Sequence, residues 1–458
     1  MKRYLNFKKI FVVLVLLLAL FLRFNNLHQR THFDADQEWL ATRATELLKG
    51  DLPLLGPVTS IGSFSIGPGF IYLWAFFSFL FSGAPVAGAY LSAVLGLLFL
   101  ITLFLFTKYF IDLKVAYLVL FLAAISSKLI FWDQQPWAPS LFYTAQMLIL
   151  AGGYISIKKQ VGYLILAVGL VLAFQSHFGV ILSFVSLLVY FLLVRPVKPK
   201  VMTSIATVAI LFVGFLPNLV FDLSHNFINL KKLFEVFRGD SVDYFISLNK
   251  VINVLNSSAT SLIYPKNTNL LDTIFTKGLF ALVLVNAFSL LRDKKLKNLS
   301  LLLLTTALLP AILFYLQQGK FSEYYLLMSV PSLILLLALF LKRLISYKMI
   351  VFLIIIISVY FNFKQIDSRY VSWNLKAKEN IAQKIVEIGG TEGYGISINS
   401  KRGDRFGFEY IFDYYQIKAD VPPKIGETRI FSVAIPQGFE GIVGTHSYDG
   451  IGLLWSGI

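Results

Sequence analysis

The chain has no cysteine, and only 14% of its 458 residues are charged. The missing cysteines exclude disulfides, thiolate metal sites and cysteine nucleophiles. The low charge excludes a disordered chain, a coiled coil and an ordinary soluble enzyme, in which about 25% of residues are charged. Hydrophobic residues instead make up 57% of the chain and gather in uncharged runs of membrane-spanning length. The composition therefore predicts an α-helical polytopic membrane protein.

Acidic residues are fewer than basic ones: 25 Asp and Glu stand against 41 Lys and Arg, which gives a net charge of +16. Such an excess can indicate nucleic-acid binding, but these basic residues lie in short connections between apolar runs. By the positive-inside rule, short connections rich in Lys and Arg lie on the cytoplasmic side of the membrane. We therefore expect a multi-pass protein of the cytoplasmic membrane, in contact with membrane lipids, with a cytoplasmic N-terminus and no nucleic-acid partner.

About 11 transmembrane helices are expected, at residues 10–22, 84–107, 115–131, 141–157, 161–175, 178–194, 201–217, 274–291, 299–316, 324–341 and 349–362. The apolar run 70–81 is too short to span, and a crossing there would turn every later basic loop outward. We expect a juxtamembrane or re-entrant helix there. The run 161–194 exceeds one span, so it should turn near 175–177.

The C-terminal segment differs in kind from the rest of the chain. Residues 375–389 read as an amphipathic helix, followed by short alternating runs at 394–398, 429–435 and 444–455 between Gly and Pro residues. Two domains are expected. Residues 1–365 form a transmembrane domain whose first outer loop spans 23–83, and residues 366–458 form a small extracytoplasmic α/β domain.

Acids, histidines and other polar groups gather near span ends on the side opposite the basic connections: Asp34, Asp36, Glu38, Asp133, His177, Asp222, His225, Lys320, Glu323 and Tyr324. Carboxylates there can act as a general base, hold a cation or pair with Arg. Cationic and phenolic groups suit a phosphate. Each residue alone also fits a plain structural role, such as a cap, a solvated loop charge or a snorkelling lysine. Their common location favours a lipid-phosphate substrate handled outside the membrane.

Several stretches in order over about residues 10–345 resemble the GT-C glycosyltransferases. The match is best with the branch that includes protein O-mannosyltransferases, lipid A aminoarabinose transferases and RgtA/B/C/D-like transferases. The stretches are 23–24 (RF) with 33–37 (FDADQ), 52–57 (LPLLGP) with 65–72 (SIGPGFIY), 137–140 (WAPS), 175–177 (QSH), 216–227 and 323–325 (EYY). Ala138 stands where this family usually has Asn, and Glu38 where many relatives have a small residue.

The resemblance implies an inverting-type glycosyltransferase that moves a sugar from a polyprenyl-phosphate donor to an acceptor on the extracytoplasmic face. It makes Asp36, and after it Asp34, the candidate general base. Donor and phosphate binding would fall to His177, His225, Lys320, Tyr324, Asp133 and Glu323. No cofactor is certain; a divalent cation on Asp34 and Asp36 stays open, as do the sugar (hexosyl or pentosyl) and the acceptor (glycan, lipid or protein).

Other functions remain as alternatives. A transporter or flippase of lipid-linked sugars would place ionisable residues in mid-span or interrupt helices in paired halves, and mid-span charges are nearly absent here. A non-catalytic sugar-lipid sensor would use the outer tail to bind a partner. A polysaccharide polymerase or ligase would rely on basic outer-loop residues, against which the acids after the first span argue.

Overall fold

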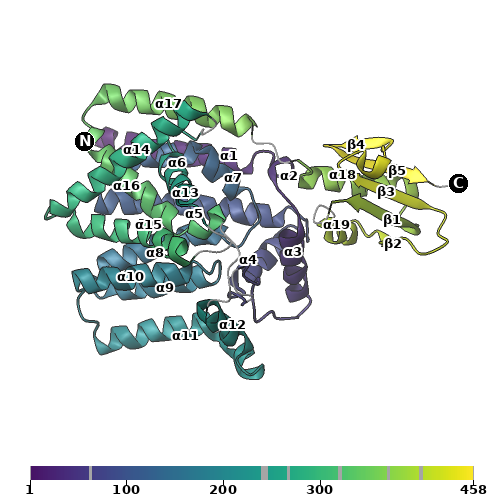
Figure 1. Cartoon of the computed structure of the whole chain (residues 1–458), viewed down its shortest axis with the longest axis horizontal. Coiled ribbons are helices and arrows are strands. Elements are labelled where there is room, and N and C mark those ends of the chain that lie inside the picture. The colour runs from purple at the N-terminus through teal and green to yellow at the C-terminus, as the bar shows by residue number, and fades with distance from the viewer. Residues whose placement is uncertain are drawn as a thin grey trace.

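The computed structural model describes residues 2–60, 64–238, 246–265, 269–317, 322–368, 372–401 and 406–456. These residues form a bundle of long helices with a small helix-covered sheet at one end (Figure 1). The architecture is the one that the sequence predicts, an α-helical polytopic protein with a small α/β unit at the C-terminus. The predicted fold class is therefore confirmed.

Every predicted span coincides with helix in the bundle. In chain order these helices are α1 (Lys2–Phe24), α5 (Ala87–Phe110), α6 (Leu113–Ile125) with α7 (Ser127–Asp133), α8 (Ser140–Ile155), α9 (Val161–Phe174), α10 (Val180–Val194), α11 (Val201–Ser224), α14 (Leu270–Ser289) with η1 (Leu290–Arg292), α15 (Lys297–Gln317), α16 (Ser329–Leu344) and α17 (Lys348–Ser368). Five helices of the described ranges are long and apolar enough to cross a membrane, or six if α6 and α7 count as one. Helices α8, α9 and α10 are shorter apolar helices.

The structure refines three of the expected spans. The run at 115–131 is bent by 62° between α6 and α7, because Ser126 adopts an extended backbone conformation. The Ser127 N–H after the break donates to Asn362 Oδ1 of α17 at 2.8 Å, which compensates for the interrupted helix ladder. The run at 161–194 turns where expected, since α9 ends at Phe174 and α10 begins at Val180. The expected span at 324–341 starts later, because the 3-10 turn η2 (Glu323–Leu326) precedes α16.

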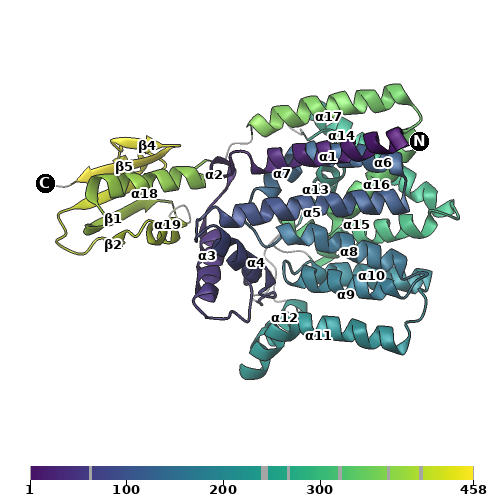
Figure 2. The same cartoon turned by 180° about the vertical axis from the view of Figure 1, so that it is seen from behind.

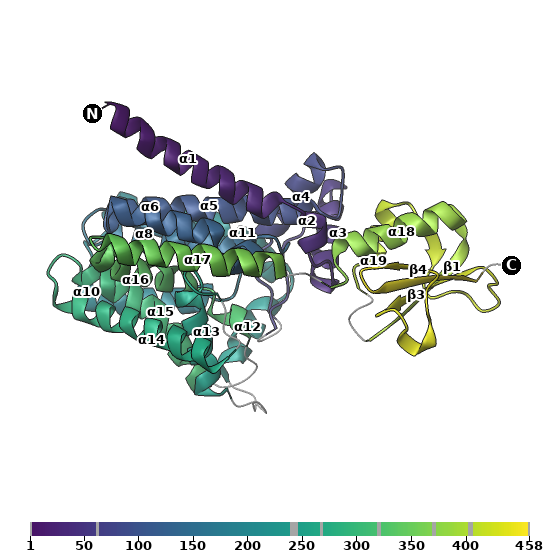
Figure 3. The same ribbon diagram turned by 90° about the horizontal axis from the view of Figure 1, so that it is seen from above.

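The loop after α1 contains three short helices, α2 (Leu27–Arg30), α3 (Ala35–Leu48) and α4 (Gly69–Leu80). At 1.5 Å per residue, α4 is about 18 Å long, well short of a hydrocarbon layer of about 30 Å. A 12-residue helix in this place agrees with the expected juxtamembrane segment. Helices α12 (Ile228–Arg238) and α13 (Leu248–Thr260) follow α11. The N-terminal end of α1 points away from the bundle (Figure 3).

The C-terminal sheet has the strand order β2-β1-β3-β5-β4. Its strands are β1 (Glu392–Ser400), β2 (Lys418–Asp420), β3 (Ile430–Ile435), β4 (His446–Tyr448) and β5 (Ile451–Ser456). Strand β1 pairs in parallel with β2 and β3, while β5 is antiparallel to β3 and β4. Helix α18 (Leu375–Gly389) has the predicted bounds. The predicted run at 444–455 is a hairpin rather than one strand, and α19 (Phe408–Tyr414), β2 and η3 (Phe439–Gly441) were not predicted.

The first loop lies between the helical bundle and the sheet (Figure 2). The N-terminus and the connection between α10 and α11 lie at the far end of the bundle (Figure 1). Acids of the first loop and basic connections are therefore at opposite ends of the bundle. The domain division between residues 365 and 366 stays a prediction.

Candidate active site

A central cavity of about 500 Å³ lies beside the start of α3. Its walls come from α3, residues 57–60, the turn before α8, the turn between α9 and α10, and η2, and they include Asp36, Trp39, Ser60, Trp137, His177 and Tyr324. Segments far apart in the sequence thus meet around one space. The cavity is half-enclosed by aromatic rings: Tyr324 packs edge-on against Trp137, with ring centroids 5.0 Å apart.

A second space, the polar hollow, adjoins the central cavity. It has a volume of about 530 Å³ and is lined by His32, Asp34, Trp132, Gln135, Ser322 and Glu323 among others. Asp36, Trp137 and Tyr324 line both spaces. The Asp36 side chain therefore lies on the boundary between the central cavity and the polar hollow.

A third space, the apolar groove, leads from the central cavity to the side of the bundle. It measures about 520 Å³ and runs between α9, α10, α11 and α12, with Phe174, Phe184, Leu211, Phe215 and Leu230 in its walls. Ile66 and Phe178 line both the groove and the central cavity. Only 6% of the apolar window of α11 is buried, so the outer wall of the groove faces the surroundings of the bundle.

The three acids at the start of α3 have three different environments. Asp34 is the N-cap residue, and its Oδ1 accepts from Lys378 Nζ of α18 at 3.0 Å. Glu38 accepts from the N–H groups of Gly407 and Tyr410 at 3.0 and 3.1 Å, and so caps α19. In the part of the chain that the structure describes, no group bonds to the Asp36 carboxylate. Asp36 is therefore the acid that is available to a substrate.

The surroundings of Asp36 favour its protonated form. Partial burial beside the cavity walls raises the pKa of Asp36, and the negative charge of Asp34 raises it further. Burial lowers the pKa of the adjacent His32, against the opposing effect of Asp34. A carboxylate whose pKa is moved toward the working pH is a better general base than an ordinary exposed Asp.

The turn between α9 and α10 is held by Gln175 and presents His177 to the cavity. Gln175 Oε1 accepts from Gly69 N–H at 2.7 Å, and its Nε2 donates to the Gly214 carbonyl at 2.6 Å. His177 Nδ1 accepts from Gly179 N–H at 3.0 Å. Burial lowers the pKa of His177 to about 3, so the ring is neutral and Nε2 carries its proton. This buried Nε2 has no partner among the described residues.

Of the other predicted site residues, Tyr324 and Glu323 lie at the site. The Tyr324 hydroxyl is 3.5 Å from both Ser60 Oγ and Tyr325 Oη. Glu323 Oε2 lies 3.9 Å from Lys128 Nζ. Ala138 is in the cavity wall, where the GT-C motif would place an amide. Lys320 is outside the described residues.

Asp133 and His225 lie away from the three spaces. Asp133 Oδ2 accepts from Arg23 Nε at 2.7 Å, and both side chains are buried. Arg23 also donates to the Ala124 carbonyl at 3.0 Å, so the pair joins α1 to the α6–α7 break. His225 stacks on Phe221 at 4.1 Å and is exposed. Its neighbour Asp222 accepts from Asn229 N–H at 2.9 Å at the start of α12.

Sequence reasoning missed Lys378. Leu375, Ala382 and Ile385, on the same face of α18 as Lys378, are all fully buried, and Lys378 itself is 1% exposed. A lysine at a core position of an amphipathic helix was the available signal, because such a charge needs a buried partner. Its partner Asp34 could not have been named, since it precedes Lys378 by 344 residues.

The arrangement of the helical bundle, the loop helices at its end and the C-terminal sheet is also found in proteins of known structure. The chain is similar to ArnT from Cupriavidus metallidurans, in the crystal structure with undecaprenyl phosphate, with a TM-score of 0.62 and 12% identity over 94% of this chain and 93% of that one. The apo structure of ArnT from the same organism aligns with a TM-score of 0.60 and 11% identity.

A second similar protein is the oligosaccharyltransferase AglB from Archaeoglobus fulgidus, in complex with an inhibitory peptide and a dolichol-phosphate. The TM-score is 0.56 and the identity 13%, over 92% of this chain and 65% of AglB, so this chain spans less than two thirds of AglB. No family model and no curated protein sequence matches the chain. At these identities the likeness establishes the fold, and the reaction has to be argued from the site.

Proposed function

We propose that this protein is a membrane glycosyltransferase that moves a sugar from a polyprenyl-phosphate donor to an acceptor on the extracytoplasmic face. The observation that carries the proposal is the position of Asp36. Its carboxylate has no bonded partner in the described chain, and it stands between a cavity that continues into an apolar groove and a polar hollow. A lipid-linked donor and a hydrophilic acceptor can thus approach the same carboxylate from two sides.

The donor fits the groove and the central cavity together. An isoprenoid tail would lie in the apolar groove, and the phosphate and sugar would pass between Ile66 and Phe178 into the cavity. The similar structures support this choice, because ArnT is bound to undecaprenyl phosphate and AglB to a dolichol-phosphate. His177 Nε2–H and the Tyr324 hydroxyl would donate to the phosphate. Lys320 stays a candidate cation for it.

The acceptor would enter through the polar hollow. Asp36 takes the proton of the acceptor hydroxyl as the acceptor oxygen attacks the anomeric carbon from the face opposite the phosphate. The bond from the anomeric carbon to the phosphate oxygen breaks, and polyprenyl phosphate leaves with the electron pair. Donors placed on the leaving phosphate stabilise its growing charge and lower the barrier. Glu323 lies in the hollow wall and is a candidate to orient the acceptor.

A divalent cation does not fit the acids well. One AglB structure is a complex with Zn and sulfate, but here the ammonium group of Lys378 lies on Asp34 Oδ1 and would repel a cation. Among the described residues no group of three His, Cys, Asp or Glu side chains is placed to hold a metal. We therefore assign no step to a metal and leave Asp34 to its ion pair.

The orientation also belongs to this proposal. We place the first loop, the three spaces and residues 366–458 outside the cytoplasmic membrane, because the connections rich in Lys and Arg lie at the other end of the bundle. Asp133 and His225, which line none of the three spaces, have structural roles in this scheme. Asp133 balances Arg23, and His225 packs on Phe221.

The test is donor consumption by purified protein in lipid, with a panel of radiolabelled polyprenyl-phosphate sugars. Asp36→Asn should lower turnover about 10²- to 10⁴-fold, the usual contribution of a general base. Glu46→Gln is the matched control, since Glu46 is on the same helix and pairs only at the surface with Arg43; it should keep wild-type turnover. Full activity of Asp36→Asn would remove Asp36 as the base. Movement of intact donor across vesicles without sugar transfer would favour a transporter.

A further inference from the structure

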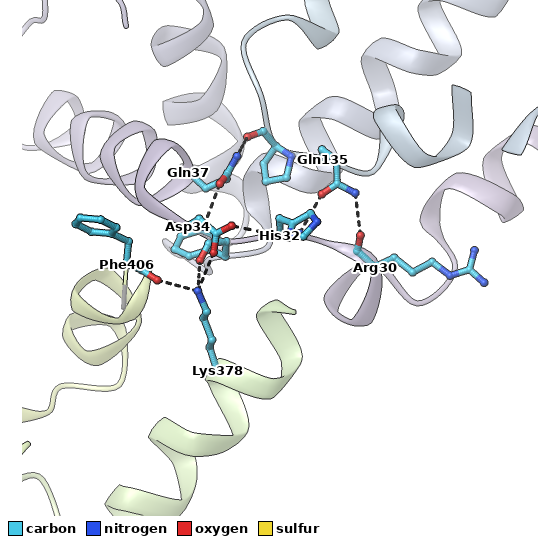
Figure 4. Close-up of polar contacts among 9 residues, drawn as sticks. Arg30, His32, Asp34, Gln37, Gln135, Lys378 and Phe406 are labelled. Atoms are coloured by element: carbon cyan, nitrogen blue, oxygen red, sulfur yellow. Dashed lines mark hydrogen bonds and ion pairs between the residues drawn. The ribbon is translucent and has the colours of Figure 1, made fainter. Parts of the chain in front are cut away.

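Lys378 of the C-terminal domain contacts the acid segment of the first loop, residues 33–38, which carries Asp34, Asp36 and Glu38. Lys378 Nζ donates to the Phe33 carbonyl at 2.8 Å, to the Phe406 carbonyl at 2.7 Å and to Asp34 Oδ1 at 3.0 Å (Figure 4). Its three N–H donors thus have three acceptors, and its side chain is 1% exposed. Two of the acceptors are neutral carbonyls, so Asp34 supplies the negative charge that a buried ammonium group needs.

The surrounding contacts fix Lys378 in this place. Glu38 accepts from two N–H groups at the start of α19, and the Leu375 N–H of α18 donates to the Thr31 carbonyl at 2.9 Å. A Cβ atom on Gly407 would overlap the Phe33 carbonyl oxygen, which shows how closely the two segments approach. The C-terminal domain is therefore docked on the residues that lead into α3.

We propose that Lys378 is a positioning residue of the transfer reaction: it offsets part of the charge of Asp34, so that Asp36 ionises more readily than it would beside an unpaired Asp34. This inference rests on the proposed function for the role of Asp36 as base. It also gives the C-terminal domain a part in the chemistry, because the charge balance of the acid segment depends on a residue of that domain.

Asp34 and Asp36 lie close together, as the N-cap and a first-turn residue of α3. Two carboxylates so close repel, and the charge of Asp34 raises the pKa of Asp36. An ammonium group 3.0 Å from Asp34 offsets that charge. Among the described residues, the other titratable side chains that line the two spaces at Asp36 are His32, His177, Glu323 and Tyr324, and Lys128 lies 3.9 Å from Glu323. Glu38 is turned to α19, and His177 is neutral, so Lys378 is the cation with a direct bond to the acid pair.

The decisive experiment is the pH profile of kcat/KM for Lys378→Met, with and without Asp34→Asn. Without Lys378 the charge of Asp34 is unbalanced, which raises the pKa of Asp36, so activity is lost at a higher pH than in wild type. We expect the acidic limb to move up by about one pH unit. Adding Asp34→Asn removes the unbalanced charge and should return the limb to the wild-type position or below it. Lys384→Met is the matched control, because Lys384 is on the same helix and pairs with Glu387.

Other outcomes would overturn the inference. Equal loss of activity at every pH, without recovery in the double variant, would mean that Lys378 only holds the domain in place. If Lys378→Met does not fold, the double variant with Asp34→Asn still tests the proposal, because it leaves no unpaired buried charge. An acidic limb at a higher pH in the double variant than in wild type would contradict the proposal. A carbon-13 NMR titration of Asp36 gives the same comparison without substrate. If the wild-type protein is inactive on every donor but the pKa of Asp36 measured by NMR is higher in Lys378→Met, the proposed function is refuted. The effect of Lys378 on the charge of Asp34 is then still supported.

Discussion

As the proposed base, Asp36 should set how the rate of transfer depends on pH. Its pKa is raised by burial and by Asp34 from the ordinary value of 3.8, and the base works only when ionised. Transfer should therefore fall as the pH drops through this raised pKa, and the midpoint of the acidic limb should lie above 3.8. His177 has a pKa lowered to about 3, so it adds no second limb near neutral pH. A profile of kcat/KM against pH measures this; a midpoint below 3.8 would exclude Asp36.

Asp133 should matter for stability rather than for chemistry. Asp133→Ala leaves the Arg23 guanidinium buried without its carboxylate, and breaking a buried pair in this way costs about 3–5 kcal/mol. The expected result is a lower thermal unfolding midpoint in detergent, with residual turnover in the molecules that stay folded. The exposed Glu387→Gln is the control and should change stability by less than about 0.5 kcal/mol. A stable but inactive Asp133→Ala protein would instead place Asp133 in the reaction.

At the scale of elements, the contact between α19 and the first loop should be sensitive to a single methyl group. Gly407 has a φ of +92°, and an added Cβ would meet the Phe33 carbonyl oxygen. Gly407→Ala should undock α19 and expose residues 406–414 to protease, with a loss of turnover of about tenfold or more. Gly426→Ala is the control for backbone strain, because Gly426 also has a positive φ, +89°, but an added Cβ there would meet no other atom. Equal effects of both variants would refute the docking explanation.

The elements that the sequence predicts well are those set by a single local constraint. Apolar runs gave the bundle helices, because a lipid core needs long helices whose backbone groups are satisfied internally. The break between α6 and α7 was missed, since its acceptor Asn362 comes from α17. Helix α19 was missed because seven residues give too little periodicity, and because its cap Glu38 comes from the first loop, 369 residues before Gly407.

The sequence predicts where the candidate site lies, but only part of the roles of its individual residues. The placement of acids on one side pointed to Asp34, Asp36, His177 and Tyr324, which the structure brings to one cavity or its edge. The sequence could not say which acid is free, because the partners of Asp34 and Glu38 follow them by 344 and 369 residues or more. Asp133 looked like a site residue for the same reason, since the sequence does not show that its carboxylate is buried against Arg23.

At the scale of the whole molecule, the three adjoining spaces form one route from the side of the bundle to the polar hollow beside Asp34. A photoactivatable polyprenyl phosphate should therefore label peptides from the groove walls, chiefly α9, α10, α11 and α12. Asp36→Asn should keep this labelling, because Asp36 lies beyond the groove, and excess unlabelled polyprenyl phosphate should abolish it. Mass spectrometry of the labelled peptides measures the result. Labelling mainly on α14 to α17 would place the tail elsewhere and contradict the route.

The bond between residue 34 and residue 378 also has a consequence for biosynthesis. The ribosome adds about 5–20 residues per second, so roughly 20–70 s pass between synthesis of Asp34 and of Lys378. During that interval Asp34 has no Lys378 to pair with, and the N–H groups of α19 that Glu38 caps do not exist. The contacts of Asp34 and Glu38 are therefore completed only when the last fifth of the chain arrives, and a chain that stops early carries the helical bundle with Asp34 and Asp36 still repelling each other.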